Sequence, residues 1–145
     1  MSYALDSNLL IRSIEENHQQ QDEALDAINK LVGRGEDVFL LPQFLYEFWV
    51  VATRPKKDNG LGLNTTDAET FLAKFESVFP IKHDTEAVYS EWRQMVTSNA
   101  VQGKPSHDAR IAAALTVHGI LNLVTFNKDH FKRFSSINPL LPSEV

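Results

Sequence analysis

The stretch FLLPQFLYEFWVVATRP, residues 39–55, decides the fold class of this chain. Its first residues belong to the short apolar run VFLL at 38–41, which is typical of a strand buried inside a sheet. Pro42 interrupts the run, and residues 43–54 then continue without glycine or proline for long enough to form a helix, which Pro55 ends. A buried strand followed directly by a helix is the repeating unit of an α/β sheet.

The remainder of the chain repeats this alternation of strands and helices. Further apolar runs are strand candidates at 3–6, 79–83 and 121–126. Periodic or capped segments predict helices from about residue 9, over 20–35, over 67–78 behind a Thr66–Glu69 capping box, from a cap at Asp84 to about 101, and over 106–118. The pattern therefore predicts an α/β sandwich with a mostly parallel sheet and helices on its faces.

Composition indicates one ordinary globular domain, residues 1–145. Hydrophobic residues make up 43% of the chain and charged residues 23%. The absence of cysteine excludes a disulfide framework, a thiolate metal site and a cysteine nucleophile. We expect a cytoplasmic protein without a membrane span, because no signal peptide or long apolar run is visible.

The formal net charge of −5 argues against binding nucleic acid through an overall positive field. It leaves room for a local basic patch beside an acidic site. Carboxylates that hold a divalent cation would themselves contribute to such a charge.

Glu47 places a carboxylate in the most apolar part of the sequence. Its neighbours three and four positions away on the expected helix are Gln43, Phe44, Val50 and Val51, so no basic residue of that helix can pair with it. A buried carboxylate without a partner is costly, and it either keeps a proton or binds a cation. A rim position or an ion pair with a distant basic residue explains Glu47 as well as a functional site does.

Other oxygen-bearing residues stand where a site of such a sheet should form. Asp6 directly follows the first strand candidate and Asn127 the last, and in open α/β sheets sites lie beyond the carboxyl ends of strands. Asp108 falls in the first turn of its helix, and Asp129 lies close to Asn127. Each alone is explained as a cap or turn residue. Together with Glu47 they form a cysteine-free oxygen set suited to Mg²⁺ or Mn²⁺.

Three segments carry a resemblance to a known family. They are ALDSNLLIR at 4–12, LPQFLYEFWVVATRP at 41–55 and PSHDARIAAALTVHGILNLVTFNKDHF at 105–131. In order and spacing they resemble the motif blocks of the PIN-domain family, in particular VapC-type toxin ribonucleases of bacterial toxin–antitoxin pairs. The resemblance implies one PIN-like nuclease domain: a three-layer sandwich whose mostly parallel central sheet has four or five strands flanked by helices.

The resemblance also implies a metal-dependent ribonuclease with a defined set of site residues. By motif position, the metal-binding acids are Asp6, Glu47 and Asp108. The family's fourth position, usually acidic, is Asn127 here, which joins the implied catalytic set. Asp129, nearby, is implied to support the site, and either Asn127 or Asp129 could complete it. The implied Mg²⁺ or Mn²⁺ ion activates water for in-line attack on the phosphodiester, which leaves a 5′-phosphate and a 3′-hydroxyl.

Two further residues are implied to support the site. Asn8 matches the family residue that orients the first aspartate, and Thr125 matches the hydroxyl that precedes the fourth position. His107 and His130 lie close to site residues, although histidines in such places more often pack against helices or cap them.

An RNA substrate needs positive partners for its phosphates. Basic residues near the implied metal ligands are therefore candidates for RNA binding: Arg54, Lys56, Lys104, Arg110 and Lys128. The resemblance implies two protein partners as well, a cognate antitoxin and a second copy of the chain in a homodimer. The aromatic residues of helix 43–54 suit a dimer interface and a core equally.

Several alternatives stay open at this point. Asn127 allows a PIN fold with weak or no activity that serves as a binding partner, and the same site could cleave single-stranded DNA or process RNA. An aspartyl phosphatase is disfavoured, because Asn8 stands where such an enzyme needs a second aspartate. Dinucleotide binding is disfavoured too, because no GxGxxG follows the first strand.

Overall fold

The computed structural model describes all 145 residues, and its centre is a four-stranded sheet. The strands lie in the order β2-β1-β3-β4, and every neighbouring pair is parallel. Their bounds are β1 (Ser2–Leu5), β2 (Asp37–Phe39), β3 (Asn122–Val124) and β4 (Asn138–Leu140). The expected α/β fold with a parallel sheet of four or five strands is confirmed.

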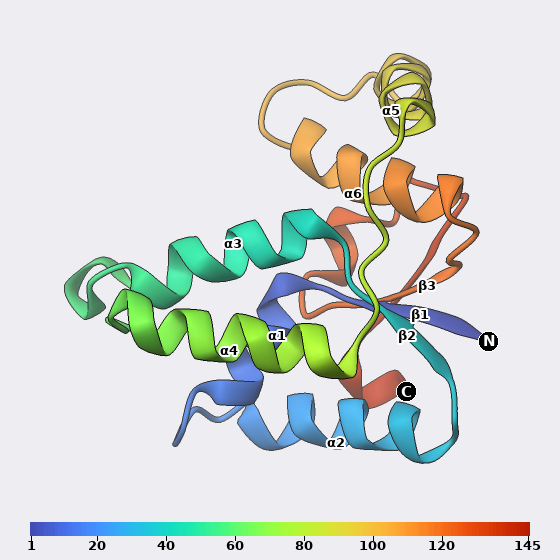
Figure 1. Ribbon diagram of the computed structural model, residues 1–145. Coiled ribbons are helices and arrows are strands. Elements are labelled where there is room, and N and C mark those ends of the chain that lie inside the picture. Colours follow the sequence, from blue (N-terminus) through green and yellow to red (C-terminus); the bar gives the residue numbers. More distant parts are fainter.

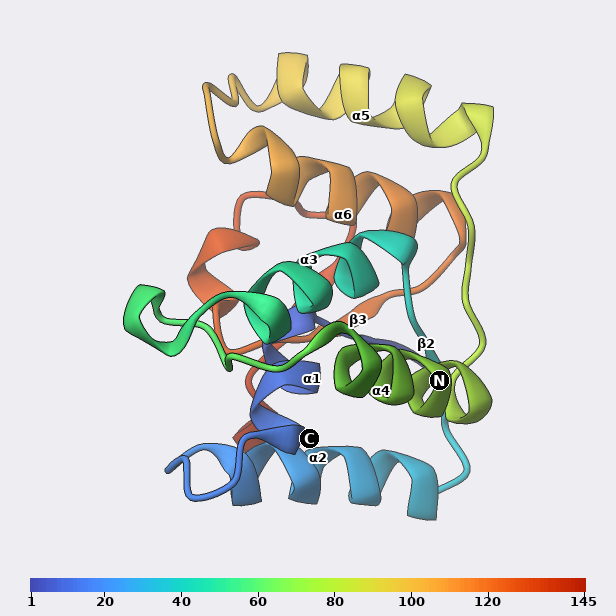
Figure 2. The same ribbon diagram turned by 60° about the vertical axis from the view of Figure 1, so that its left-hand side comes forward.

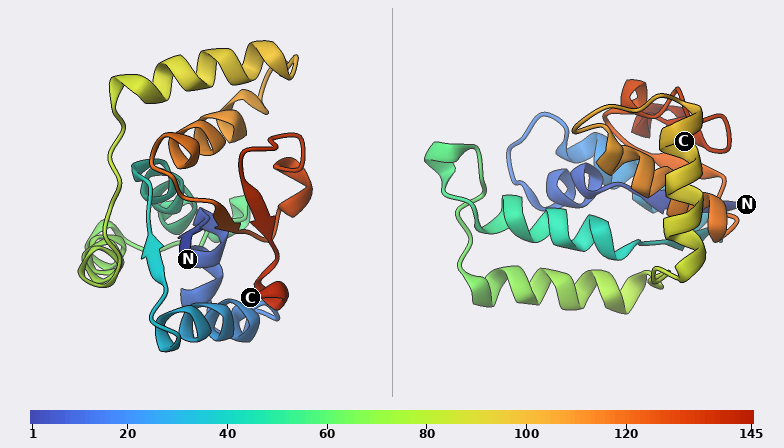
Figure 3. Two further views of the ribbon diagram at one scale, coloured as in Figure 1. Left: turned by 90° about the vertical axis from the view of Figure 1, so that its right-hand side faces the viewer. Right: turned by 90° about the horizontal axis from the view of Figure 1, so that it is seen from above.

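Six helices cover this sheet in layers (Figures 1 and 2). They are α1 (Ser7–Ile14), α2 (Gln21–Gly33), α3 (Pro42–Thr53), α4 (Thr65–Val78), α5 (Glu86–Ser98) and α6 (Ser106–Val117). Figure 3 shows α1 and α2 on one side of the strands, and α6, backed by α5, on the other. Short 3-10 turns follow at 56–58, 128–130 and 142–144.

The aromatic stretch around Glu47 is split between core and surface. Phe44 and Phe48 are fully buried on one face of α3, and the Phe48 ring meets Phe75 of α4 edge to face at 5.1 Å between centroids. Tyr46, on the other face, is 63% exposed. The buried rings are four residues apart, so they lie on the same face of the helix. This apolar face packs inward, while intervening positions reach solvent.

Two strand expectations differ from the structure. Residues 79–83 do not form a strand and contribute only one parallel bridge, between Ile81 and Leu40. Conversely, β4 was not among the expected strands, and Pro139 in its middle cannot donate to a ladder. Since β4 is the outer strand next to β3, its proline is tolerated there.

The expected helix caps also need correction. α4 is capped by Asn64, whose side chain accepts a hydrogen bond from the N–H of Asp67 at 2.7 Å, so the Thr66 capping box is wrong. Asp84 does not cap α5, which begins after Thr85; its carboxylate binds Arg110 instead, at 2.7 Å.

No helix of the protein is both long and apolar enough to span a membrane.

Candidate active site

Asp6 directly follows β1, which is an inner strand of the sheet, and it is only 4% exposed. Its Oδ1 accepts from the N–H of Ser7, and its Oδ2 accepts from the hydroxyl of Thr125, both at 2.7 Å. Asn8 Nδ2 lies 3.4 Å from Asp6 Oδ2 and 3.3 Å from Thr125 Oγ1, and Asn8 Oδ1 accepts from the N–H of Phe126. Asn8 and Thr125 therefore fix the Asp6 carboxylate between β1 and the end of β3.

The pKa of Asp6 is raised from 3.8 to about 6, chiefly because burial disfavours its charged form. Hydrogen bonds from Thr125 and Ser7 oppose this rise, while the negative charges of Glu47 and Asp108 add to it. The three acids from distant parts of the sequence are therefore close enough to act on one another electrostatically.

Glu47 is half-buried on α3, and neutral donors hold both of its carboxylate oxygens. Oε2 accepts from the hydroxyl of Ser7 at 2.7 Å, and Oε1 accepts from Nε2 of Gln43 at 2.9 Å. Neither Glu47 nor Asp6 forms an ion pair with a basic side chain. The alternative of a distant Arg or Lys partner for Glu47 is therefore not what the structure shows.

Asp108 lies in the first turn of α6, and its side chain is 30% exposed. Nδ1 of His130 is 3.9 Å from its Oδ2. The pKa of Asp108 is raised, chiefly by burial and further by the negative charge of Glu47. Three neighbouring basic groups, those of His130, His107 and Lys104, oppose this rise.

A cavity of about 320 Å³ brings the candidate residues together. We call it the carboxylate cavity. Its lining includes, from four separate parts of the chain, Asp6, Asn8, Glu47, Arg54, Asp108, Asn127 and His130. The parallel sheet causes this convergence, because the ends of β1 and β3 lie side by side and α3 and α6 flank them.

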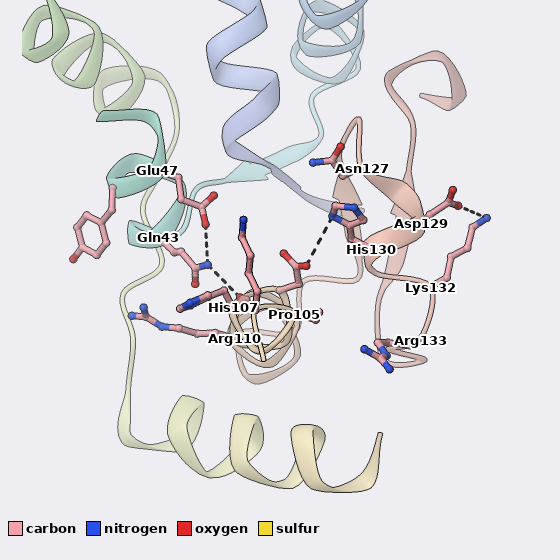
Figure 4. A pocket seen from close by; sticks show the side chains of 13 residues that line it. Gln43, Glu47, Pro105, His107, Arg110, Asn127, Asp129, His130, Lys132 and Arg133 are labelled. Atoms are coloured by element: carbon pink, nitrogen blue, oxygen red, sulfur yellow. Dashed lines mark hydrogen bonds and ion pairs between the residues drawn. The ribbon is translucent and has the colours of Figure 1, made fainter. Parts of the chain in front are cut away.

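A larger cavity of about 1020 Å³ adjoins the first and shares Glu47, Asp108, Asn127 and His130 with it (Figure 4). We call it the cationic cavity because four basic side chains contribute to its lining: Lys104, Arg110, Lys132 and Arg133. A cavity of this size, lined by both carboxylates and basic side chains, can hold a phosphodiester chain beside the carboxylates.

Asn127 and Asp129 are placed differently. Asn127 lines both cavities, whereas Asp129 lines only the cationic cavity and is bound by Lys132, which lowers its pKa (Figure 4). Of the two, Asn127 is the one that borders the carboxylate cavity.

The five basic residues expected to bind RNA are also separated by the structure. Lys104 and Arg110 line the cationic cavity, and Arg54 lines the carboxylate cavity. Lys128 lines neither, because its ammonium group binds both carboxylate oxygens of Glu144 at 2.8 Å. Lys56 lines neither cavity and packs near Gly62.

Two residues of the site were missed by sequence reasoning: Ser7 and Gln43, which hold Glu47. Gln43 stands four positions before Glu47, which is a spacing at which helical side chains meet. The signal was visible in the sequence, because Gln43 is the only polar residue three or four positions from Glu47 on its helix. Nothing local indicates the contact of Ser7 with Glu47, because forty residues separate them.

The donor set suits a hard divalent cation. It consists of carboxylate oxygens that no lysine or arginine pairs with. Burial raises the pKa of both Asp6 and Asp108, and a cation would relieve that cost. No three Asp, Glu or His side chains are grouped tightly enough to enclose an ion by themselves. Mg²⁺ is commonly held by one or two carboxylates and completes its octahedron with water and phosphate oxygens, so the residues present fit such an ion.

The family model of the PIN domain matches residues 3–136 of the chain. The protein belongs to the PIN domain family. The match covers nearly the whole sequence, including every carboxylate of the site.

Solved structures of similar fold support this membership. VapBC2 from Rickettsia felis, bound to a promoter DNA fragment, superposes with a TM-score of 0.70 at 19% identity, covering 97% of this chain and 98% of that one. VapBC-1 from nontypeable Haemophilus influenzae gives 0.70 at 15% identity, with 99% of both chains covered. VapC20 from Mycobacterium tuberculosis, a Sarcin-Ricin loop cleaving toxin, gives 0.63 at 16% identity over 94% and 99%. A comparison with curated protein sequences gave no significant match.

Proposed function

We propose that this PIN-domain protein is a metal-dependent endoribonuclease and the toxin of a toxin–antitoxin pair. One observation carries the proposal: Asp6, Glu47 and Asp108 converge on a cavity that opens into a groove lined with cations. The fold shared with toxin–antitoxin proteins, including a toxin that cleaves the Sarcin-Ricin loop, supports RNA as the substrate and an antitoxin as a partner.

In this proposal Asp6, Glu47 and Asp108 would hold a Mg²⁺ or Mn²⁺ ion together with water and phosphate oxygens. When bound, the ion would lower the pKa of water and offset the charge that develops on the phosphate. Asn127 offers the site a neutral amide rather than a fourth carboxylate, so the site carries less negative charge against which the phosphate must bind. A homodimer is part of the proposal, and it is supported only by the family resemblance.

The cationic cavity supplies the substrate contacts. Lys104 and Arg133 form no ion pair within the chain and can bind phosphate oxygens directly. Arg110 and Lys132 are engaged by Asp84 and by an exposed aspartate respectively, so phosphate must compete with these carboxylates for them.

Cleavage of mixed RNA by antitoxin-free protein tests this function. We expect wild-type protein to cleave RNA with Mn²⁺ and to be inactive with EDTA, and Asp108→Asn to be inactive in both conditions. Asp129→Asn is the matched control: it makes the same chemical change at an exposed aspartate outside the carboxylate cavity and should retain activity.

Three results would contradict the proposal. If folded wild type and Asp108→Asn give equal cleavage, the activity does not come from this site. If both are inactive on RNA but wild type cleaves single-stranded DNA, the metal site stands and the substrate is wrong. Inactivity on both nucleic acids, with no Mn²⁺ binding, would instead favour a binding partner without catalysis.

A further inference from the structure

Gln43 is a buried polar residue in the wall of the cationic cavity, and only 8% of it is exposed. Its Nε2 donates two hydrogen bonds, to Oε1 of Glu47 at 2.9 Å and to the backbone carbonyl of His107 at 3.2 Å (Figure 4). His107 directly precedes Asp108 on α6. The Gln43 amide therefore links the Glu47 carboxylate on α3 to the backbone of α6 next to Asp108.

A second neutral donor completes the connection. Ser7, which follows Asp6, donates its hydroxyl to the other oxygen of Glu47 at 2.7 Å. Hydrogen bonds thus run from Ser7 through Glu47 and Gln43 to His107. They link the three elements that carry the three acids of the site.

The orientation of the Gln43 amide is unambiguous. Both partners of Nε2 are acceptors, so turning the amide over would place Oε1 against a carboxylate and a carbonyl oxygen. In this orientation Oε1 is buried and receives no hydrogen bond. A buried acceptor without a donor opposes folding, so an apolar side chain would suit this position better if packing were its only role.

The chemistry of the amide also matters. A lysine or arginine here would pair with Glu47 and compete with any cation for it, and a carboxylate would repel Glu47. An uncharged side chain with two N–H groups can hold the carboxylate while leaving its charge available.

We propose that Gln43 is a positioning residue that fixes the Glu47 carboxylate relative to Asp108 before a divalent cation binds. This inference rests on the proposed metal-dependent function. Residues that orient metal ligands typically change metal affinity by about 10- to 100-fold when they are replaced. Without the hydrogen bond from Gln43, only Ser7 holds the half-buried Glu47 side chain, so Oε1 is no longer fixed relative to α6 and the cation must order it on binding.

Mn²⁺ affinity, measured by electron paramagnetic resonance of the free ion, tests the inference without relying on activity. Three proteins are compared: wild type, Gln43→Met and Gln21→Met. Methionine keeps the length of glutamine but donates no hydrogen bond. Gln21 is the matched control, because its Nε2 also donates to a backbone carbonyl, that of Ser13 at 3.3 Å, away from both cavities. Thermal unfolding in EDTA is recorded for each protein.

We expect Gln43→Met to bind Mn²⁺ about 10- to 100-fold more weakly than wild type. Its unfolding temperature in EDTA should be no lower than that of Gln21→Met, which should bind Mn²⁺ like wild type. If Gln43→Met does not fold, Gln43→Asn carries the same expectation, because its shorter amide cannot reach both acceptors.

The outcomes separate this inference from the function on which it rests. Folded wild-type protein that binds no Mn²⁺ would overturn the metal-dependent function itself. Wild type and Gln43→Met with equal Mn²⁺ affinity would overturn only the positioning role. Weaker binding accompanied by a clear loss of stability in EDTA, relative to Gln21→Met, would overturn it in favour of a packing role.

Discussion

Replacing Asp6 by asparagine should change how the stability of the metal-free protein depends on pH. Asp6 is buried, and its pKa is raised from 3.8 to about 6 by burial and by the charges of Glu47 and Asp108. The folded protein therefore holds a proton on Asp6 at pH values where the unfolded chain has released it. Stability must then fall as pH rises through this interval, because the native state binds more protons than the unfolded state.

The magnitude follows from the shift. The interval from 3.8 to about 6 is roughly two pKa units, and at 1.36 kcal/mol for each unit it corresponds to about 3 kcal/mol. Asp6→Asn lacks this titration. The free energy of unfolding of the variant minus that of wild type should therefore increase by about 3 kcal/mol, most of it between about pH 4 and pH 7.

Urea unfolding in EDTA at a series of pH values measures this difference. Asparagine cannot accept the hydrogen bonds of Asp6 from Ser7 and Thr125 in full, but that loss does not depend on pH and shifts the whole curve equally. Asp129→Asn is the control: Lys132 lowers the pKa of Asp129 below its usual 3.8, so the stability that wild type gains over this variant with rising pH is acquired mostly below about pH 4, and the difference should stay nearly flat from pH 4 to pH 7. A difference between Asp6→Asn and wild type that stays flat from pH 4 to pH 7 would refute the reasoning.

The same pair of proteins responds differently to metal. At pH 7, Mn²⁺ at 100 times its dissociation constant should stabilise wild type by about 2.7 kcal/mol. Asp6→Asn should gain much less, because one oxygen ligand and its charge are gone. Equal stabilisation of both proteins would place the ion elsewhere.

Other predictions test the loop after α3 and the substrate groove. Gly60→Ala should lower stability by about 1–3 kcal/mol, because a Cβ there would overlap the backbone carbonyl of Arg54. Gly33→Ala, with open space around it, should raise stability by about 0.5–1 kcal/mol. Urea unfolding that ranks the two variants the other way contradicts this packing of the loop. Lys104→Ala should weaken RNA binding and reduce its logarithmic salt dependence by about 0.7, whereas Lys128→Ala should leave both unchanged. Fluorescence titration of RNA at several salt concentrations measures this, and equal effects of the two substitutions would show that the cationic cavity is not the path of the RNA.

Much of the fold could be predicted because its signals are local. Pro42 and Pro55 bracket α3 by removing donors and fixing backbone angles, and short apolar runs mark β1, β2 and β3. The signals failed where tertiary contacts decide. Residues 79–83 are apolar enough for a strand, but the chain there meets β2 at one bridge only. β4 forms despite its proline because the edge of β3 is available to it.

In the candidate site, too, the sequence indicated some features and only the tertiary structure revealed others. Asp6, Glu47, Asp108 and Asn127 could be named from their positions in the motif blocks, and all four border one cavity. Their hydrogen-bond partners could not all be named, since the hydroxyl of Ser7 reaches Glu47 only after β1 and α3 have packed together.

The sequence by itself determined the alternation of β1, β2 and β3 with the helices, the apolar face of α3 and the acids that the site offers. These depend on the identity and spacing of neighbouring residues, which chain geometry converts directly into periodic faces and breaks. Only the tertiary structure decided which charges are available. Lys128 is neutralised by Glu144, Asp129 by Lys132, and Glu47 is held by Ser7 and Gln43 without neutralisation. The reason is physical: an ion pair or hydrogen bond depends on where side-chain atoms meet in space, and residues far apart in sequence meet only once the core has packed.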